Sequence, residues 1–157
     1  MESHHAGLST QLRGTYECRA DDRGRLRLPS QLVARHAESD RGAFVLKKGF
    51  DRCLDLYPLS SWEEKSRSYE ELNERDPDQR RLRRKFFKSV TDVTLDGSSR
   101  ILLPKRLAES VAIERDVIIL GVGTHYEIWD PAEFEREDEE ADDDSALAAR
   151  VADKTDA

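Results

Sequence analysis

Residues 21–29 read DDRGRLRLP, and residues 96–104 read DGSSRILLP. Both stretches begin with an aspartate, carry an arginine four residues later, and end in a leucine and a proline. A further leucine follows each proline by three residues, at Leu32 and Leu107. Because the same residue types recur in the same order, the sequence predicts an internal repeat that sets the architecture of the chain.

The match between the two copies continues after the offset changes from 75 to 72 residues. Small, acidic, apolar and aromatic residues then coincide again. The matched pairs are Gly49 with Gly121, Leu54 with Tyr126, Asp55 with Glu127, Leu56 with Ile128, Tyr57 with Trp129 and Trp62 with Phe134. The three missing residues fall in the polar segment 37–43, where a loop can absorb them.

Each copy predicts the same series of elements: a strand, a turn, a short strand, a short helix that begins at a proline, and two further strands. The expected ranges are 15–19, 26–28, 30–36, 43–47 and 54–57 in the first copy, and 90–95, 101–103, 105–112, 117–120 and 126–129 in the second. Between the copies we expect a helix that Ser61 caps and that ends near Asn73, followed by a basic helix over 79–88. Asp130-Pro131 predicts one more, shorter helix.

The turn in each copy has a local explanation. Asp21 and Asp96 can accept hydrogen bonds from the backbone two residues on, and Gly24 can take a positive φ. Each aspartate can also pair with the arginine four residues later, which is an ordinary structural clamp. The same turn can present Arg23, Arg25 and Arg27, which alternate and would share one face of a strand. A basic β-ribbon of this kind fits the major groove of DNA.

Charge is distributed unevenly along the 157 residues, which carry a formal net charge of −7. Residues 133–157 hold 11 acidic and 3 basic residues, so the rest of the chain holds 22 acidic and 23 basic ones. We expect a disordered, solvated acidic tail, although competition with DNA for basic patches is an alternative. A second basic cluster runs from Arg80 to Lys88; it can bind phosphate, or it can be the solvated face of a helix whose apolar face contains Leu82 and Phe86.

The sequence argues against several other classes of protein. The two cysteines, Cys18 and Cys53, do not suggest a disulfide framework or a metal site, and Cys53 fits a small core residue. No group of residues has the spacing of a nucleophile with its base or of metal ligands, so we expect no enzyme, no cofactor and no metal. We also see no signal peptide or membrane-spanning segment, and we expect a cytoplasmic protein.

The motifs resemble those of the MraZ family of bacterial transcriptional regulators. The resemblance rests on four elements in order over residues 12–135: residues 21–29, the run Asp51-Arg52-Cys53-Leu54-Asp55-Leu56-Tyr57-Pro58, residues 95–104, and Tyr126-Glu127-Ile128-Trp129-Asp130. Two positions depart from the pattern. Ala20 replaces a leucine, and Ser99 replaces the glycine of the second turn, which we expect to reshape that turn because serine tolerates positive φ poorly.

The resemblance implies an α+β fold. Two AbrB/SpoVT-like units of the swapped-hairpin type would form a pseudo-two-fold barrel with flanking helices. Together with the composition of the two ends, which the resemblance does not cover, this gives the expected division: a flexible N-terminus (1–11), a first unit (12–60), connecting helices (61–88), a second unit (89–135) and an acidic disordered tail (136–157).

The resemblance also implies a function and partners. It implies a nucleoid-associated regulator of the division and cell-wall gene cluster, which binds direct repeats in double-stranded DNA upstream of its own operon. It implies ring-shaped homo-oligomers, octamers or dodecamers, and oligomerisation is also expected because each copy is small for a stable core. The residues expected to contact DNA are Arg23, Arg25, Arg27, Arg100 and Lys105, with Asp21, Gly24 and Asp96 shaping the turns. The alternative is a protein-interaction module, antitoxin-like or an adaptor, that does not bind DNA directly.

Overall fold

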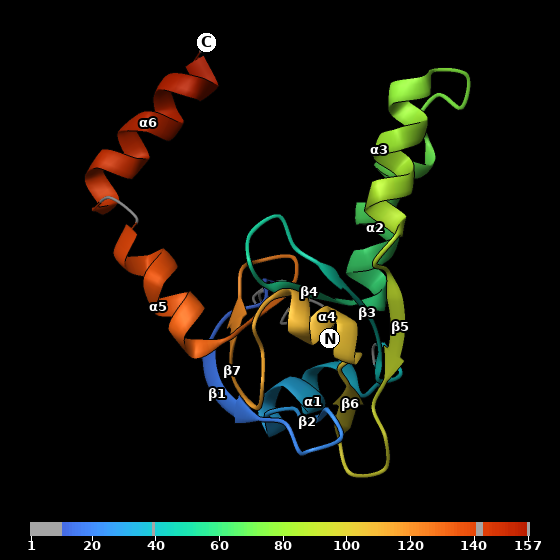
Figure 1. Cartoon of the computed structure of the whole chain (residues 1–157), viewed down its shortest axis with the longest axis vertical. Coiled ribbons are helices and arrows are strands. Elements are labelled where there is room, and N and C mark those ends of the chain that lie inside the picture. The colour runs from blue at the N-terminus through green and yellow to red at the C-terminus, as the bar shows by residue number, and fades with distance from the viewer. Residues whose placement is uncertain (1–10, 39, 141–142, 157) are drawn as a thin grey trace, which may run out of the picture.

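The computed structural model describes residues 11–38, 40–140 and 143–156 (Figure 1). The segment expected to be a flexible N-terminus lies outside these residues except for Gln11. The first copy contains β1 (Thr15–Arg19), β2 (Arg25–Arg27), α1 (Ser30–His36), β3 (Ala43–Lys48), β4 (Leu54–Pro58) and α2 (Leu59–Glu70). The rest of the chain contains α3 (Pro77–Phe87), β5 (Thr91–Thr94), β6 (Arg100–Leu102), α4 (Lys105–Ser110), β7 (Asp116–Gly121), β8 (Tyr126–Trp129), α5 (Pro131–Glu140) and α6 (Asp144–Asp156).

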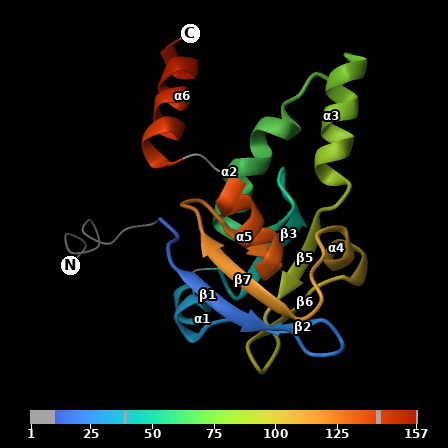
Figure 2. The same ribbon diagram turned by 60° about the vertical axis from the view of Figure 1, so that its left-hand side comes forward.

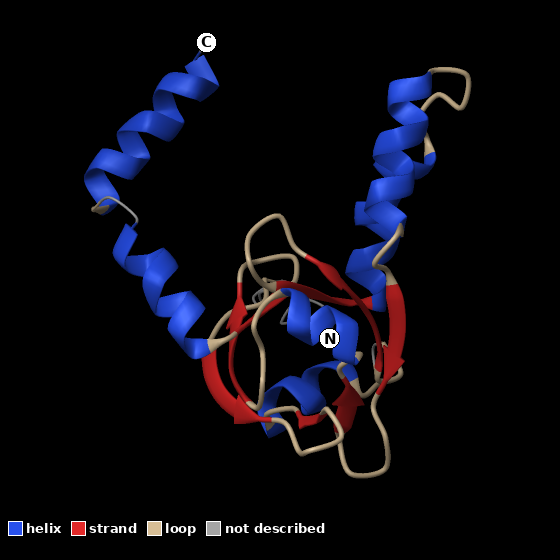
Figure 3. Ribbon diagram, in the orientation of Figure 1, coloured by secondary structure: helices blue, strands red, loops and turns tan. Residues whose placement is uncertain are grey.

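The strands are arranged with pseudo-two-fold symmetry. Six of them form one antiparallel sheet in the order β1-β7-β8-β4-β3-β5, and β2 pairs with β6 in a separate two-stranded ribbon. In the large sheet β1 corresponds to β5, β3 to β7 and β4 to β8. Replacing each strand by its counterpart gives the same order in reverse. Figure 3 shows the strands curving around, although no ladder among the described residues joins the ribbon and the large sheet into one closed barrel. The α+β fold with a tandem repeat is therefore confirmed.

The two copies exchange strands. β1 of the first copy pairs with β7 of the second, β5 of the second pairs with β3 of the first, and β4 pairs with β8. Among the described strands, only the hairpins β3–β4 and β7–β8 form ladders within a copy, and Ala20 and Leu26 add one isolated bridge in the first copy. The copies are therefore interleaved, and neither can form its part of the sheet without the other.

Alternate residues along the strands point to opposite faces of the sheet, and those on the inner face form the main core. Leu26 and Ile101, the central residues of β2 and β6, are 0% and 1% exposed and pack in the main hydrophobic cluster with Phe44 and Leu46 of β3. Val45, which points to the other face of β3, joins a second cluster. That cluster also contains Tyr57, Trp62 and Phe86, and the last two rings stack with centroids 5.3 Å apart. It attaches α2 and α3 to the outside of the sheet.

The predicted boundaries differ for three helices. The basic helix predicted over 79–88 spans Pro77–Phe87, because Asp76 caps it by accepting from the N–H of Gln79 at 3.2 Å and a proline fits its first position. The helix predicted to begin after Ser61 starts earlier, at Leu59, because Pro58 already has the backbone geometry that precedes a helix, so Ser61 lies inside it and is not its cap. The helix predicted over 105–112 ends at Ser110 because Ala112 adopts a left-handed conformation, with φ of 62°.

The acidic C-terminal region also differs from expectation. In place of a disordered tail from residue 136, α5 continues to Glu140 and α6 spans Asp144–Asp156. Alanines favour the helical conformation of α6, and the Asp143 carboxylate caps it by accepting a hydrogen bond from the N–H of Ala146 at 2.9 Å. Figure 1 shows α5 and α6 leading away from the sheet. Within the described part of the chain, none of the helices has the length and apolar character needed to span a membrane.

A buried histidine connects the two copies inside the core. His36 at the end of α1 is 3% exposed; its Nδ1 lies 2.9 Å from Asp40 Oδ2, and its Nε2 lies 2.9 Å from the hydroxyl oxygen of Tyr126 in β8. Burial lowers the pKa of His36, although the neighbouring Asp40 carboxylate opposes this shift. The residue at the matched position of the second copy is the apolar Val111.

The depressed pKa of His36 predicts a loss of stability in mild acid. Below about pH 6.5 the unfolded chain takes up the proton before the folded chain does. The free energy of unfolding should therefore fall with pH until the lower, folded pKa is reached, by at most about 1.4 kcal/mol per pH unit. Urea unfolding between pH 7.5 and 5 measures this change, and a His36→Gln variant should show a smaller slope. Equal slopes in the two proteins would contradict the prediction.

Candidate nucleic-acid interface

The first Asp-x-x-x-Arg turn is held by one carboxylate. Oδ1 of Asp21 accepts hydrogen bonds from the backbone N–H groups of Arg23 and Arg25, both at 2.9 Å, and Oδ2 accepts one from Arg25 Nε at 2.8 Å. The backbone N–H of Gly24 closes the turn on the carbonyl of Asp21, at 3.1 Å. The hydrogen bond from the Arg25 backbone is the main reason that the pKa of Asp21 is lowered. The carboxylate is therefore charged and fixed in place.

The second turn repeats this geometry. Oδ1 of Asp96 accepts from the backbone N–H groups of Ser98 and Arg100 at 2.8 and 3.0 Å, and Oδ2 accepts from Arg100 Nε at 2.9 Å. Ser99 takes a φ of 61°, close to the 79° of Gly24. The expectation that serine would reshape the second turn is therefore wrong. The surrounding hydrogen bonds hold Ser99 in the left-handed region that glycine adopts freely.

Two backbone hydrogen bonds join the two turns. The N–H of Leu103 donates to the carbonyl of Gly24 at 2.8 Å, and the N–H of Leu28 donates to the carbonyl of Ser99 at 3.0 Å. The β2–β6 ladder continues the pairing by placing Arg25 opposite Leu102 and Arg27 opposite Arg100. Sequence reasoning missed these contacts because they join residues more than 70 positions apart, although the repeat itself was the signal that the two turns could pair.

The expected DNA-contacting arginines of the first turn lie close together but in different settings. The prediction that all three share one strand face is wrong because β2 begins only at Arg25, which leaves Arg23 in the turn. Arg25 is half-buried, and its Nε donates a hydrogen bond to the Asp21 carboxylate. The side chains of Arg23 and Arg27 are exposed and form no hydrogen bond or ion pair with any residue that the structure describes. Both guanidinium groups are therefore open to an external anion.

Arg100 and Lys105, the expected DNA contacts in the second copy, differ from each other. Arg100 is engaged by two carboxylates, because besides Asp96 its guanidinium lies 3.8 Å from Asp21 Oδ2 of the other turn. Its side chain is 27% exposed. Lys105 is exposed at the first position of α4. The cross-copy contact to Asp21 gives Arg100 a part in joining the two turns.

The second basic cluster lies on a different part of the molecule. It belongs to α3, which stands beside α2 on the opposite side of the sheet from the β2–β6 ribbon (Figures 1 and 2). Three of its arginines are engaged: Arg81 with Asp78 at 3.1 Å, Arg83 with the Glu74 carboxylate at 3.2 Å, and Arg80 with the Glu74 carbonyl at 2.9 Å. Phe86 is buried as expected for an apolar face, but Leu82 is 49% exposed. The two basic clusters therefore do not form one continuous surface.

Comparison with known proteins gives a consistent family assignment. Residues 11–85 and 86–155 each match the family model described as "MraZ protein, putative antitoxin-like". A protein from Thermomicrobium roseum named "Transcriptional regulator MraZ" is 42% identical over 118 residues, which cover 75% of this chain and 80% of that protein. Proteins of the same name from Moorella thermoacetica and Cytophaga hutchinsonii are 37% and 32% identical, over 89% and 78% of this chain and 96% and 82% of their own lengths.

Gly24 and Ser99 both have a left-handed backbone conformation, but we expect substitutions at these two positions to affect stability unequally. A Cβ at Gly24 would lie 2.9 Å from the carbonyl oxygen of Leu103, in a backbone conformation with φ of 79°. Gly24→Ala should therefore lower the free energy of unfolding by about 1–3 kcal/mol. Ser99→Gly should change it by less than about 1 kcal/mol, because relief of strain offsets the extra entropy of the unfolded chain. Urea unfolding measures both variants against the parent protein. An unchanged free energy of unfolding in Gly24→Ala would refute the prediction.

Proposed function

Because the chain belongs to the MraZ family, whose relatives are named transcriptional regulators, we propose that it regulates transcription by binding double-stranded DNA through the β2–β6 ribbon and its two turns. The observation that carries this proposal is the state of Arg23 and Arg27, which are exposed and unpaired among the described residues beside a rigid turn. A two-stranded ribbon with such side chains can enter the major groove.

The arginines have different roles in this proposal. Arg23 and Arg27 contact phosphates or base edges, since their guanidinium groups need no rearrangement before binding. Asp21 uses only the Nε of Arg25, so the terminal nitrogens of that guanidinium remain available for a base or phosphate in a fixed orientation. Arg100, held by two carboxylates, acts mainly as a positioning residue, and Lys105 supplies a peripheral phosphate contact.

Single ribbons are small, so we propose that several act together. A homo-oligomeric ring, octameric or dodecameric as the resemblance implies, would present one ribbon per subunit to successive direct repeats of DNA. Each weak contact then gains from the high effective concentration of its neighbours. The proposed target is the region upstream of the chain's own operon in the division and cell-wall gene cluster, and the proposed location is the nucleoid in the cytoplasm.

A second candidate function, binding to another protein, is favoured by one feature. On α6 the apolar side chains of Leu147 and Val151, four residues apart, are 40% and 56% exposed. Such a pair on a projecting helix suits a hydrophobic groove on a partner. A stoichiometric protein partner that purifies with the chain at low salt, without nucleic acid, would favour this function over DNA binding.

Replacement of single arginines should separate the ribbon from the rest of the basic surface. Arg27→Ala and Arg25→Ala should each weaken binding to the upstream DNA about 5- to 150-fold, the range for losing one base or phosphate contact. The matched control is Arg81→Ala, which removes an exposed arginine from α3 and should leave affinity unchanged. Mobility shift at low and moderate salt measures all three. Equal affinity of the Arg25 and Arg27 variants with the parent would remove the ribbon from the interface, and failure of the parent to bind at low salt would refute the function.

The proposed assembly can be checked without DNA. Multi-angle light scattering should give a mass several times the 18.0 kDa of one chain. A mass of one chain across the micromolar range would refute the ring, and would leave the DNA-binding ribbon to be tested by the arginine variants alone.

A further inference from the structure

A row of charged residues crosses three strands on the large sheet, away from the β2–β6 ribbon. Lys47 of β3 stands opposite Asp55 of β4, and Asp55 stands opposite Glu127 of β8. Asp55 and Glu127 occupy matched positions in the two copies, so the pseudo-two-fold axis passes between them. Asp55 is 5% exposed and Glu127 is half-buried. Two acidic groups thus face each other across neighbouring strands with little access to water.

This arrangement leaves negative charge poorly compensated. Like charges directly opposite each other on a sheet are destabilising. Lys47 Nζ lies 3.8 Å from Asp55 Oδ2 and also donates a hydrogen bond to the carbonyl of Lys48 at 2.7 Å, while Glu127 Oε1 accepts from the neutral indole N–H of Trp129 at 2.9 Å. Asp55 has Lys47 and His125 beside it, whereas Glu127 forms no ion pair with any residue that the structure describes, which leaves a place for a cation.

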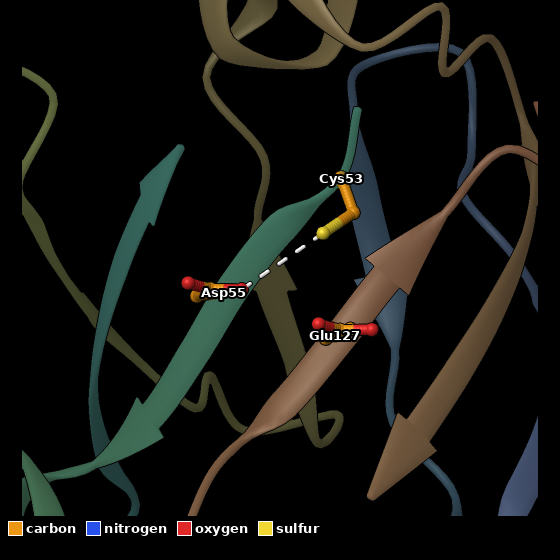
Figure 4. A group of neighbouring side chains, drawn as sticks. All are labelled: Cys53, Asp55 and Glu127. Atoms are coloured by element: carbon orange, nitrogen blue, oxygen red, sulfur yellow. Dashed lines mark hydrogen bonds between the residues drawn. The ribbon is translucent and has the colours of Figure 1, made fainter. Parts of the chain in front are cut away.

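A thiol completes the cluster. Figure 4 shows Cys53 directing its sulfur toward Asp55 at the start of β4, with Glu127 on the neighbouring strand. Sγ lies 3.9 Å from Asp55 Oδ1, and one donor atom from each of Cys53, Asp55 and Glu127 lies within 4.8 Å of the other two. The space beside them is tight, because a Cβ at Gly49 would lie 2.9 Å from Asp55 Oδ1 and 3.0 Å from Cys53 Sγ.

The surrounding residues hold these donors in place. His125 Nε2 lies 3.6 Å from Asp55 Oδ1, its Nδ1 lies 3.0 Å from Thr124 Oγ1, and its ring stacks on Tyr57 with centroids 4.5 Å apart. The hydrogen bond from the Trp129 indole N–H holds the Glu127 carboxylate. Partners of this kind commonly orient the ligands of metal ions.

We propose that Cys53, Asp55 and Glu127 bind one divalent transition-metal ion of the zinc type. A thiolate with two carboxylates is a donor set that Zn²⁺ accepts, and the sulfur favours it over Mg²⁺ or Ca²⁺. Bonds of about 2.3 Å to sulfur and about 2.1 Å to oxygen would span the Cys53–Asp55 separation at an angle somewhat wider than tetrahedral. The fourth position is left to water or to His125.

The charges balance in this proposal. Binding releases the thiol proton of Cys53 to solvent as the sulfur–metal bond forms, so one thiolate and two carboxylates carry three negative charges. Lys47 contributes one positive charge and the ion contributes two, which makes the cluster neutral. The ion would join β4 to β8 and so tie the two copies together at their symmetry axis. This inference does not depend on DNA binding.

Cobalt is a suitable probe because thiolate coordination to Co²⁺ produces a charge-transfer absorption in the near ultraviolet. The full chain, reduced and freed of metal with a chelator, is titrated with Co²⁺. We expect the absorption to saturate at one equivalent and to disappear when Zn²⁺ displaces the cobalt. Absence of this band at a tenfold excess of Co²⁺, with the cysteines shown to be reduced, would overturn the proposal.

Matched variants assign the ligands. Cys53→Ser should abolish the charge-transfer band, whereas Cys18→Ser, which removes the half-buried cysteine of β1, should keep it. Glu127→Gln, which preserves shape, should lower the Co²⁺ affinity at least tenfold, and circular dichroism checks that each variant is folded. If Cys53→Ser does not fold, the Glu127 and Cys18 variants still decide the matter. A band lost in Cys18→Ser, or unchanged affinity in folded Glu127→Gln, would refute the site.

Discussion

The reciprocal pairing of the two Asp-x-x-x-Arg turns is the constraint on which the structure depends. Each turn projects one carbonyl, from Gly24 or Ser99, to the N–H that follows the other copy's short strand. This exchange places Leu26 and Ile101 side by side at the centre of the core. Because Arg23 lies in the first turn and Arg27 in the strand β2 that follows it, the hydrogen bonds that assemble the fold also fix the geometry of the basic surface.

Much of the fold could be predicted from the sequence because the pattern that indicates each strand, turn and helix occurs twice. The strand over 15–19 and the helix over 30–36 have the predicted limits, as does the strand over 126–129. The boundary at Ser61 was wrong because a cap preference is weak beside the fixed φ of Pro58. Strand exchange could not be read directly, since alternation tells which face a residue takes but not which strand lies beside it.

The candidate sites show the same division between local and distant information. Asp21 and Arg25 could be joined from the sequence because four residues separate them within one turn. The contact of Arg100 with Asp21, and the gathering of Cys53 with Glu127, depend on pairing between copies and have no local signature. The absence of metal-ligand spacing along the chain therefore gave no information about a cluster that forms across the symmetry axis.

The mismatch between the paired strands of the ribbon has a consequence of its own. A dimer of identical chains must carry the same residue at both symmetry-related positions, but here Arg25 stands opposite Leu102 and Arg27 opposite Arg100. Because both copies stand in one chain, their matched positions can carry different residues, and one end of the ribbon is more basic than the other. Such a ribbon has polarity, so under the proposed DNA binding its two orientations on a duplex would give different complexes. If the chain binds DNA as proposed, head-to-tail arrays of sites, which all point the same way, would suit this ribbon better than palindromes.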